Sequence, residues 1–144
     1  MRAFLIFLHL LGGVLWIGGG LAAMFVSLAA RKMGRPEQGI AARLVAAVYA
    51  RMVAPGAGLI VFSGLLLALS GMNPSPWIMA MQGLGLLGAA IIFAIALPAV
   101  NRLARLDPVA QAEVFDGLRT RQRMAGMVAT TCAFVSLLAG AMYR

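Results

Sequence analysis

No charged side chain occurs between Arg51 and Arg102. The sequence MNPSP, at residues 72–76, divides this uncharged stretch into two apolar segments. Each segment is long enough to cross a bilayer, whose hydrocarbon core of about 30 Å needs roughly 20 helical residues. The chain is 62% hydrophobic and 11% charged, whereas an ordinary soluble domain is about 25% charged. The sequence therefore predicts an integral membrane protein, because it has too little polar surface to cover a globule in water.

Apolar segments separated by two polar connectors and the MNPSP turn predict an all-α fold, a single four-transmembrane-helix bundle over residues 1–144. We expect the helices at residues 3–30, 40–71, 77–103 and 118–143. Pro55 lies inside the second helix and should kink it, since proline removes an intrahelical hydrogen bond. The first segment is longer than the roughly 7–15 apolar residues of a secretory signal, and Arg31 and Lys32 close it. We therefore expect it to remain in the protein as a transmembrane helix.

The basic residues predict how the bundle is oriented. All Lys and Arg residues except Arg2 and Arg144 lie in or beside the two polar connectors. Because basic loops stay in the cytoplasm, we expect an N-out/C-out, multi-pass protein of the bacterial inner (cytoplasmic) membrane. Trp77 and Tyr143 would then lie at the outer interface, where amphipathic rings are enriched. The net charge of +8 is gathered in loops beside apolar segments, so the expected partner is the lipid bilayer and not nucleic acid.

Small residues recur at every fourth position of the second predicted helix. They are Ala42, Ala46, Ala50, Ala54 and Gly58. Helices in a membrane approach one another closely where side chains are small. We therefore expect this stripe to face a neighbouring helix.

His9, the only histidine, lies in an apolar helix. Ionisable residues inside a membrane are costly and usually functional. On a helix, His9, Gly13, Trp16 and Gly20 fall on one face, which would offer an imidazole above a flat groove suited to a planar ring such as haem b. The alternative is a structural role, in which neutral His9 forms a hydrogen bond with Ser63 or Gln82.

The haem hypothesis requires a second axial ligand, because haem iron in electron-transfer proteins generally has two, and a Met/His pair is one known combination. That ligand would be a methionine, His9 of a second copy in a homodimer, or a residue of a partner chain, unless the iron has no second ligand. The protein would then serve in electron transfer or as an accessory subunit.

Methionines near the predicted outer surface suggest a second hypothesis. They are Met72, Met79, Met81 and Met142. Because soft thioethers suit Cu(I), His9 with Met79 and Met81 would form a copper site. A third hypothesis is a cofactor-free structural subunit of a larger membrane complex. No hydrolase triad, phosphate-binding loop, paired carboxylates or zinc spacing occurs in the sequence, so no catalytic residue is predicted.

Three segments resemble a known family. The first-helix sequence HLLGGVLWIGG, which begins at His9, resembles the signature of small bacterial membrane proteins related to copper-resistance protein D (CopD). The second helix, with Arg43, Pro55 and Ser63-Gly64, and the Trp77-Ile78 start of the third look similar to the same family. HemJ-type protoporphyrinogen oxidase is a more distant likeness, and its first-helix histidine is implicated in haem binding. The resemblance implies a four-helix membrane fold in which His9 binds copper or haem.

Overall fold

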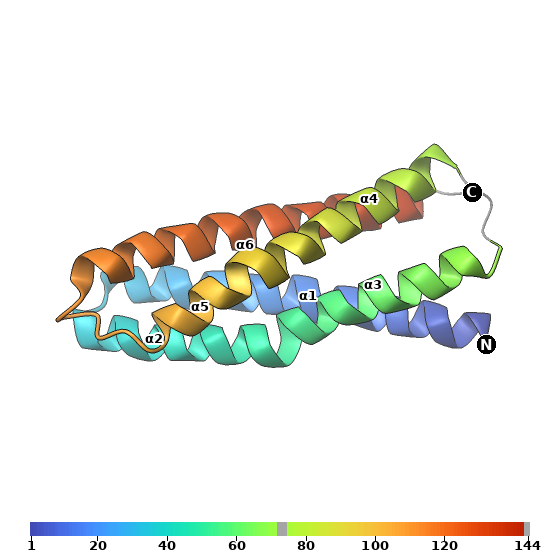
Figure 1. The fold of residues 1–144 in the computed structure, drawn as a ribbon. Coiled ribbons are helices and arrows are strands. Elements are labelled where there is room, and N and C mark those ends of the chain that lie inside the picture. The colour runs from blue at the N-terminus through green and yellow to red at the C-terminus, as the bar shows by residue number, and fades with distance from the viewer. Residues whose placement is uncertain (72–74, 143–144) are drawn as a thin grey trace.

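The computed structural model describes residues 1–71 and 75–142. The expectations for Met72 and Tyr143 fall outside these residues. Four long helical segments form the fold (Figure 1). The first is α1 (Arg2–Ala29), which continues into the 3-10 turn η1 (Ala30–Lys32). The second comprises α2 (Arg35–Val48), the π turn η2 (Tyr49–Val53) and α3 (Ala54–Leu69). The third comprises α4 (Pro76–Ile91), the π turn η3 (Ile92–Ala96) and α5 (Leu97–Leu103), and the fourth is α6 (Ala112–Ala141). The predicted all-α four-helix bundle is confirmed.

The second and fourth helical segments begin earlier than the sequence predicted, at Arg35 and Ala112 in place of residues 40 and 118. Pro36 lies in the first turn of α2, where its missing N–H costs no hydrogen bond. Glu37 and Glu113 lie in the first turns of α2 and α6, where a carboxylate is favourable beside the positive end of the helix dipole. The polar stretches that precede the apolar parts of these two helices therefore contain helical turns as well as loop residues.

Each of the two middle segments contains a π turn that ends two residues before a proline. The turn η2 ends at Val53, before Pro55, and η3 ends at Ala96, before Pro98. Proline has no N–H and its ring collides with the carbonyl four residues earlier. A wider turn with i→i+5 hydrogen bonds relieves that collision. Figure 1 shows the second segment changing direction where α2 passes into α3.

All four segments are long and apolar enough to cross a membrane. Only 22–39% of the most apolar stretch of each is buried within the protein. Large apolar side chains cover the outside instead, among them Phe4, Val14, Phe62 and Leu69. A surface of this kind is stable in hydrocarbon and not in water, which makes the chain a multi-pass membrane protein.

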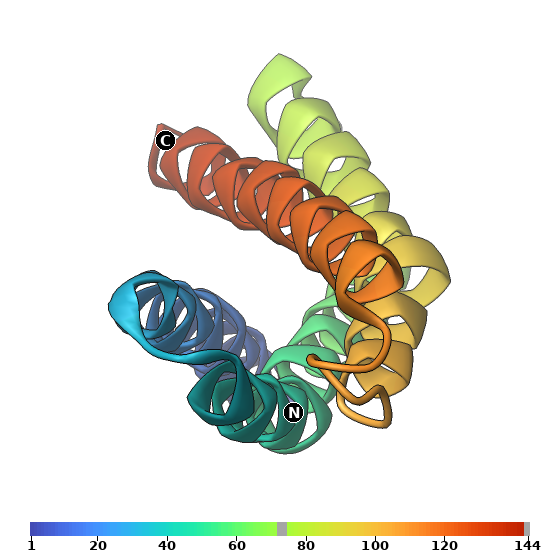
Figure 2. The same ribbon diagram turned by 90° about the vertical axis from the view of Figure 1, so that its left-hand side faces the viewer.

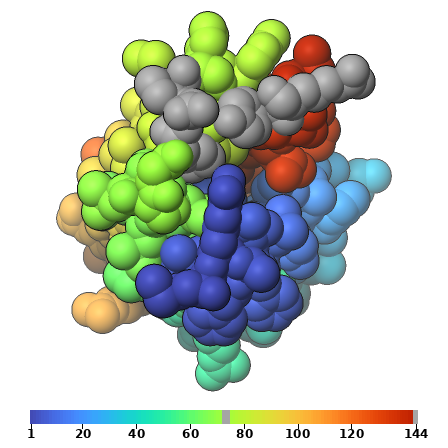
Figure 3. All heavy atoms as spheres, turned by 90° about the vertical axis from the view of Figure 1, so that its right-hand side faces the viewer, coloured from blue at the N-terminus to red at the C-terminus, as the bar shows by residue number. Residues whose placement is uncertain are grey.

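The bundle consists of two hairpins. α1 packs mainly along α3, and α4 packs mainly along α6. Figure 1 shows the first residues of α1 and the last residues of α6 at one end, which we call the terminal end. Figure 3 views the molecule from there. The opposite end, which we call the basic end, holds Arg31, Lys32, Arg35, Arg102 and Arg105. Viewed from the basic end, the helices form an open ring with its gap between α1 and α6 (Figure 2).

The alanine stripe expected on the second helix packs only in part, since Ala42 and Ala46 lie against the buried clusters. Ala50 is exposed, and a Cβ added at Gly58 would meet no atom within 4 Å. The close approach instead pairs Gly56 with Gly12, where an added Cβ on either residue would lie 2.8 Å from the other's carbonyl oxygen. A π turn places an extra residue in the helix, so α3 presents a different face from the one that strict four-residue spacing predicts.

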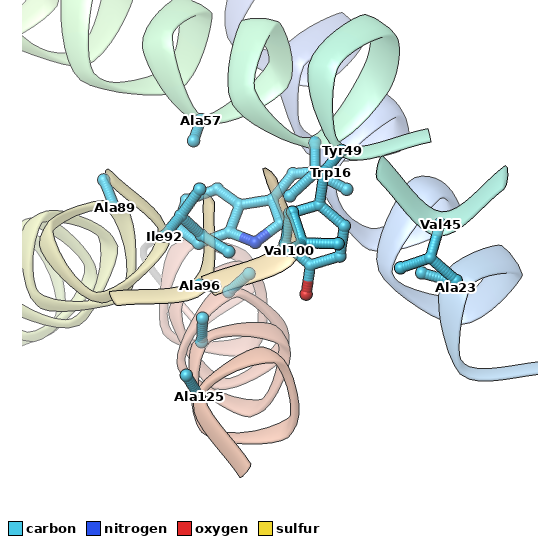
Figure 4. Packing of buried hydrophobic residues seen from close by; sticks show 13 residues of the cluster. Trp16, Ala23, Val45, Tyr49, Ala57, Ala89, Ile92, Ala96, Val100 and Ala125 are labelled. Carbon is cyan, nitrogen blue, oxygen red and sulfur yellow. The ribbon is translucent and has the colours of Figure 1, made fainter. Parts of the chain in front are cut away.

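The core lies between the hairpins in the middle of the bundle. Trp16 is 0% exposed and is the largest fully buried side chain of the described residues. Figure 4 shows it beside Tyr49, with Ala57, Ile92 and Ala96 around the two rings. Small residues form most of the remaining cluster, which lets the helix backbones come near the indole.

Candidate functional site

His9 lies in the half of the bundle nearer the terminal end, and its ring is tied to α3. Its Nδ1 lies 3.0 Å from Ser63 Oγ. Ser63 Oγ also donates a hydrogen bond to the carbonyl of Leu59. A serine hydroxyl has one proton, so Ser63 accepts from His9, and the imidazole proton resides on Nδ1. The Nε2 atom then carries the lone pair, and it has no hydrogen-bond partner among the residues the structure describes. The hydrogen bond to Ser63 is one of the two that the structural alternative predicted.

The imidazole borders a cavity of about 180 Å³. Its polar lining comprises His9 from α1, Gln82 from α4 and Ser136 from α6. Met81, also on α4, lines the same cavity, and its sulfur lies against Gly140 of α6. The remaining wall is apolar or glycine. The cavity therefore places a neutral imidazole, a thioether and an amide around one space within the apolar part of the protein.

Ser136 fixes the turn of α4 that carries Met81. Its hydroxyl donates to the Met81 carbonyl over 2.8 Å, although the two residues lie on different helices. Ser136 could not be identified from the sequence, because nothing in the sequence connects a serine of the last helix with a methionine of the third. Gly64 was noticed only as part of the family resemblance. A Cβ there would lie 3.2 Å from His9 Cε1, so the glycine gives the imidazole room against α3.

The predicted copper ligands are separated. Met81 shares the cavity with His9. Met79 is 66% exposed on the outside of the bundle and does not line that cavity. Met142 is also exposed. The two-residue spacing of Met79 and Met81 places them on different sides of a helix, since successive residues are about 100° apart.

The four residues of the helix face proposed for haem lie in different surroundings. His9 lines the cavity described above, and Gly13 lies near Ile60 of α3. Trp16 crosses the core to Gly88 of α4, where an added Cβ would lie 2.9 Å from the indole. Gly20 borders a separate hollow between α1 and α6. Trp16 itself therefore fills the space against Gly88 of α4 and not a space beside Gly13 or Gly20.

Trp16 also has the one buried side-chain nitrogen or oxygen atom of the described residues that lacks a hydrogen-bond partner, its Nε1. Such an unpaired donor costs roughly 1–3 kcal/mol. The indole stays buried because the packing of its large ring outweighs that cost.

The donors around His9 are soft or neutral. Within residues 1–71 and 75–142, no three His, Cys, Asp or Glu side chains come together. Zinc, calcium and magnesium sites are built mainly from such side chains. A thioether beside an imidazole instead matches the ligand preference of Cu(I).

The fold and this cavity define an all-α, multi-pass membrane protein with a histidine-lined cavity between its helices. Comparisons with protein-family models, with curated proteins and with solved structures give no match for this chain.

Proposed function

We propose that this chain is a copper-handling protein of the bacterial inner membrane that binds Cu(I) through His9 and Met81. One observation carries the proposal: His9, whose Nδ1 lies 3.0 Å from Ser63 Oγ, lines the same cavity as Met81. In metal-binding histidines, the ring N–H that does not face the metal commonly donates a hydrogen bond to a fixed acceptor. That hydrogen bond sets the tautomer and the ring orientation. Ser63 supplies that acceptor, and Ser136 holds the backbone of the second ligand.

Copper is the cargo in this proposal. The basic end would face the cytoplasm, because Lys and Arg accumulate on that side. His9 would then lie in the outer half of the membrane, and Cu(I) would reach it from outside. Neutral imidazole and thioether donors would hold the ion within the hydrocarbon layer without adding a second buried charge.

Replacing the two ligands tests the proposal. His9→Ala should abolish stoichiometric Cu(I) binding by the detergent-purified protein, and Met81→Leu should weaken it at least about tenfold, since each removes one donor. Competition with a coloured Cu(I) chelator measures the affinity.

Met79→Leu is the matched control, because it removes an exposed thioether on the same helix and should leave the affinity unchanged. Equal losses in Met79→Leu and Met81→Leu would show that thioethers bind copper nonspecifically. Undiminished binding by His9→Ala would refute the assignment.

Ser63→Ala tests the orientation of the imidazole. Ser63 is a positioning residue, because it touches His9 and does not line the cavity. Loss of a residue that forms a hydrogen bond with a metal-binding histidine typically costs 10–100-fold in metal affinity, and we expect Cu(I) binding to weaken by about that factor. A Ser63→Thr variant keeps the hydroxyl and should restore most of the affinity. If Ser63→Ala binds Cu(I) as tightly as the unaltered protein, the hydrogen bond has no role in the site.

Haem b bound through His9 is the second candidate, and it is supported by the same unpartnered Nε2. Pockets for small molecules and cofactors generally have volumes of about 300–1,000 Å³, and the cavity has about 180 Å³. Haem would therefore require the hairpins to separate further or a second copy to supply part of the pocket. A Soret band that disappears in His9→Ala would replace copper with haem in the proposal. Colourless, metal-free protein that co-purifies with larger subunits would favour a structural role.

A further inference from the structure

A second hollow, unrelated to His9, lies along the gap of the ring. Two adjoining cavities of about 200 and 350 Å³ both border Ser27, Arg31, Gln122 and Arg123. Because they share these four lining residues, we treat the two cavities together and call them the α1–α6 groove. It runs from the basic end to Gly20 and Thr130, near the middle of the two helices. Figure 2 shows that no other helix closes the gap between α1 and α6 at the basic end.

The mouth of the groove carries unneutralised positive charge. Arg31, Arg119 and Arg123 line it, together with one acidic residue, Asp116. Both carboxylate oxygens of Asp116 accept hydrogen bonds from Arg35, over 2.7 and 2.9 Å. That is the single salt bridge among the described residues. Among the described residues, no carboxylate lies within salt-bridge distance of the three arginines of the mouth, although the negative charge of Asp116 still acts on Arg119.

Arg119 is held in place at the mouth. Its two terminal nitrogens donate to Gln38 Oε1 over 3.0 Å and to the Ser27 carbonyl over 3.2 Å. These acceptors are neutral, so the guanidinium keeps its full charge. A fixed guanidinium loses less conformational entropy on binding an anion than a freely moving one.

The deeper part of the groove is mainly apolar. Its walls include Leu21, Met24 and Leu28 of α1 and Met127 of α6. Tyr49 and Gln122 form a polar point on the floor, where the amide of Gln122 donates to the tyrosine hydroxyl over 3.4 Å. A molecule that fills the whole groove therefore needs an anionic head and a flexible apolar chain.

We propose that the α1–α6 groove binds one anionic phospholipid, with its phosphate at Arg31, Arg119 and Arg123 and an acyl chain along the apolar walls. Basic pockets between transmembrane helices are known to bind anionic headgroups in this way. The charge of the mouth selects a headgroup with net negative charge, and the adjoining apolar walls select a lipid over a free ion. This proposal is independent of the copper site, which lies toward the other end of the bundle.

Native mass spectrometry of the full chain in detergent tests the proposal, with equal amounts of phosphatidylglycerol and phosphatidylcholine carrying the same acyl chains. We expect the protein to retain phosphatidylglycerol in preference to phosphatidylcholine. In the double variant Arg31→Gln/Arg123→Gln, that preference should fall about thirtyfold, as the loss of two arginine charges facing the headgroup implies. Arg102→Gln/Arg105→Gln removes equal charge from the same end outside the groove and should keep the preference.

A steric pair tests the acyl-chain position. Thr131→Phe places a large ring on the groove wall and should reduce phosphatidylglycerol retention several-fold. Val135→Phe places the same ring on an exposed position of α6 outside the groove and should not. The proposal would be overturned if the two double arginine variants lost the phosphatidylglycerol preference equally. It would also be overturned if Thr131→Phe left phosphatidylglycerol retention unchanged. Displacement of the lipid by excess inorganic phosphate would show that the mouth binds a phosphate ion only, and would also overturn it.

Discussion

Gly56→Leu is expected to disrupt the packing of α1 against α3 and to destabilise the protein by about 3 kcal/mol or more. A Cβ at position 56 would lie 2.6 Å from the backbone nitrogen of Trp16 and 2.8 Å from the carbonyl oxygen of Gly12. Both neighbours are backbone atoms, which cannot change rotamer to make room. The two helices would have to separate, and each would lose the dispersion contacts that hold transmembrane helices together. Thermal unfolding in detergent, followed by size-exclusion chromatography of the remaining folded protein, measures the change.

Gly58→Leu provides the control on the same helix, two residues away. A Cβ there meets no atom within 4 Å, so the leucine side chain would extend into lipid. We expect the melting temperature to stay within a few degrees of that of the unaltered protein. If both leucine variants melt alike, the Gly12–Gly56 contact does not determine the stability of the first hairpin.

Trp16→Ala is expected to cost about 3–5 kcal/mol, the usual range when a buried tryptophan is truncated in a close-packed core. The indole is 0% exposed and contacts both hairpins, since it extends from α1 to Gly88 of α4. Its removal would leave a void where the two hairpins meet. Thermal unfolding in the same detergent measures the loss.

Trp77→Ala is the matched control, because that tryptophan is 47% exposed at the start of α4. It should lower the stability by less than about 1 kcal/mol, since an exposed surface substitution rarely costs more. Trp16→Phe adds a second comparison. It removes the unpaired Nε1–H together with part of the ring, so its cost should be well below that of Trp16→Ala. Equal melting temperatures for Trp16→Ala and Trp77→Ala would contradict the central position of Trp16 in the packing.

The membrane character and the helix count followed from the sequence because they depend on length and composition alone. The uncharged stretch between Arg51 and Arg102 exceeds one span, and the MNPSP turn divides it. The first and third helical segments begin and end within one or two residues of the predicted limits. The second and fourth begin earlier, because short-range composition does not separate a polar helical turn from a polar loop.

The candidate site was predictable only in part. An imidazole in an apolar helix drew attention to His9, and Ser63 was one of two named hydrogen-bond partners. Only the rotational setting of α4 about its axis shows that Met81, and not Met79, lines the cavity with His9. The role of Ser136 required the packing of α6 against α4. Neither rotation nor packing is encoded in local spacing, and every apolar helix face is equally compatible with lipid.

The sequence by itself determined that this chain crosses a membrane as four helices with its basic residues gathered at one end. The physical reason is the high cost of placing charges and unpaired backbone groups in hydrocarbon. Each segment avoids that cost by itself, because its apolar part is uncharged and a helix pairs its own backbone groups. Only the tertiary structure decided which faces meet. The two π turns rotate the helices ahead of Pro55 and Pro98, and the Gly12–Gly56 contact sets the distance of closest approach in the first hairpin. Those choices place His9 and Met81 in the lining of one cavity and leave an arginine-lined groove between the first and last helices.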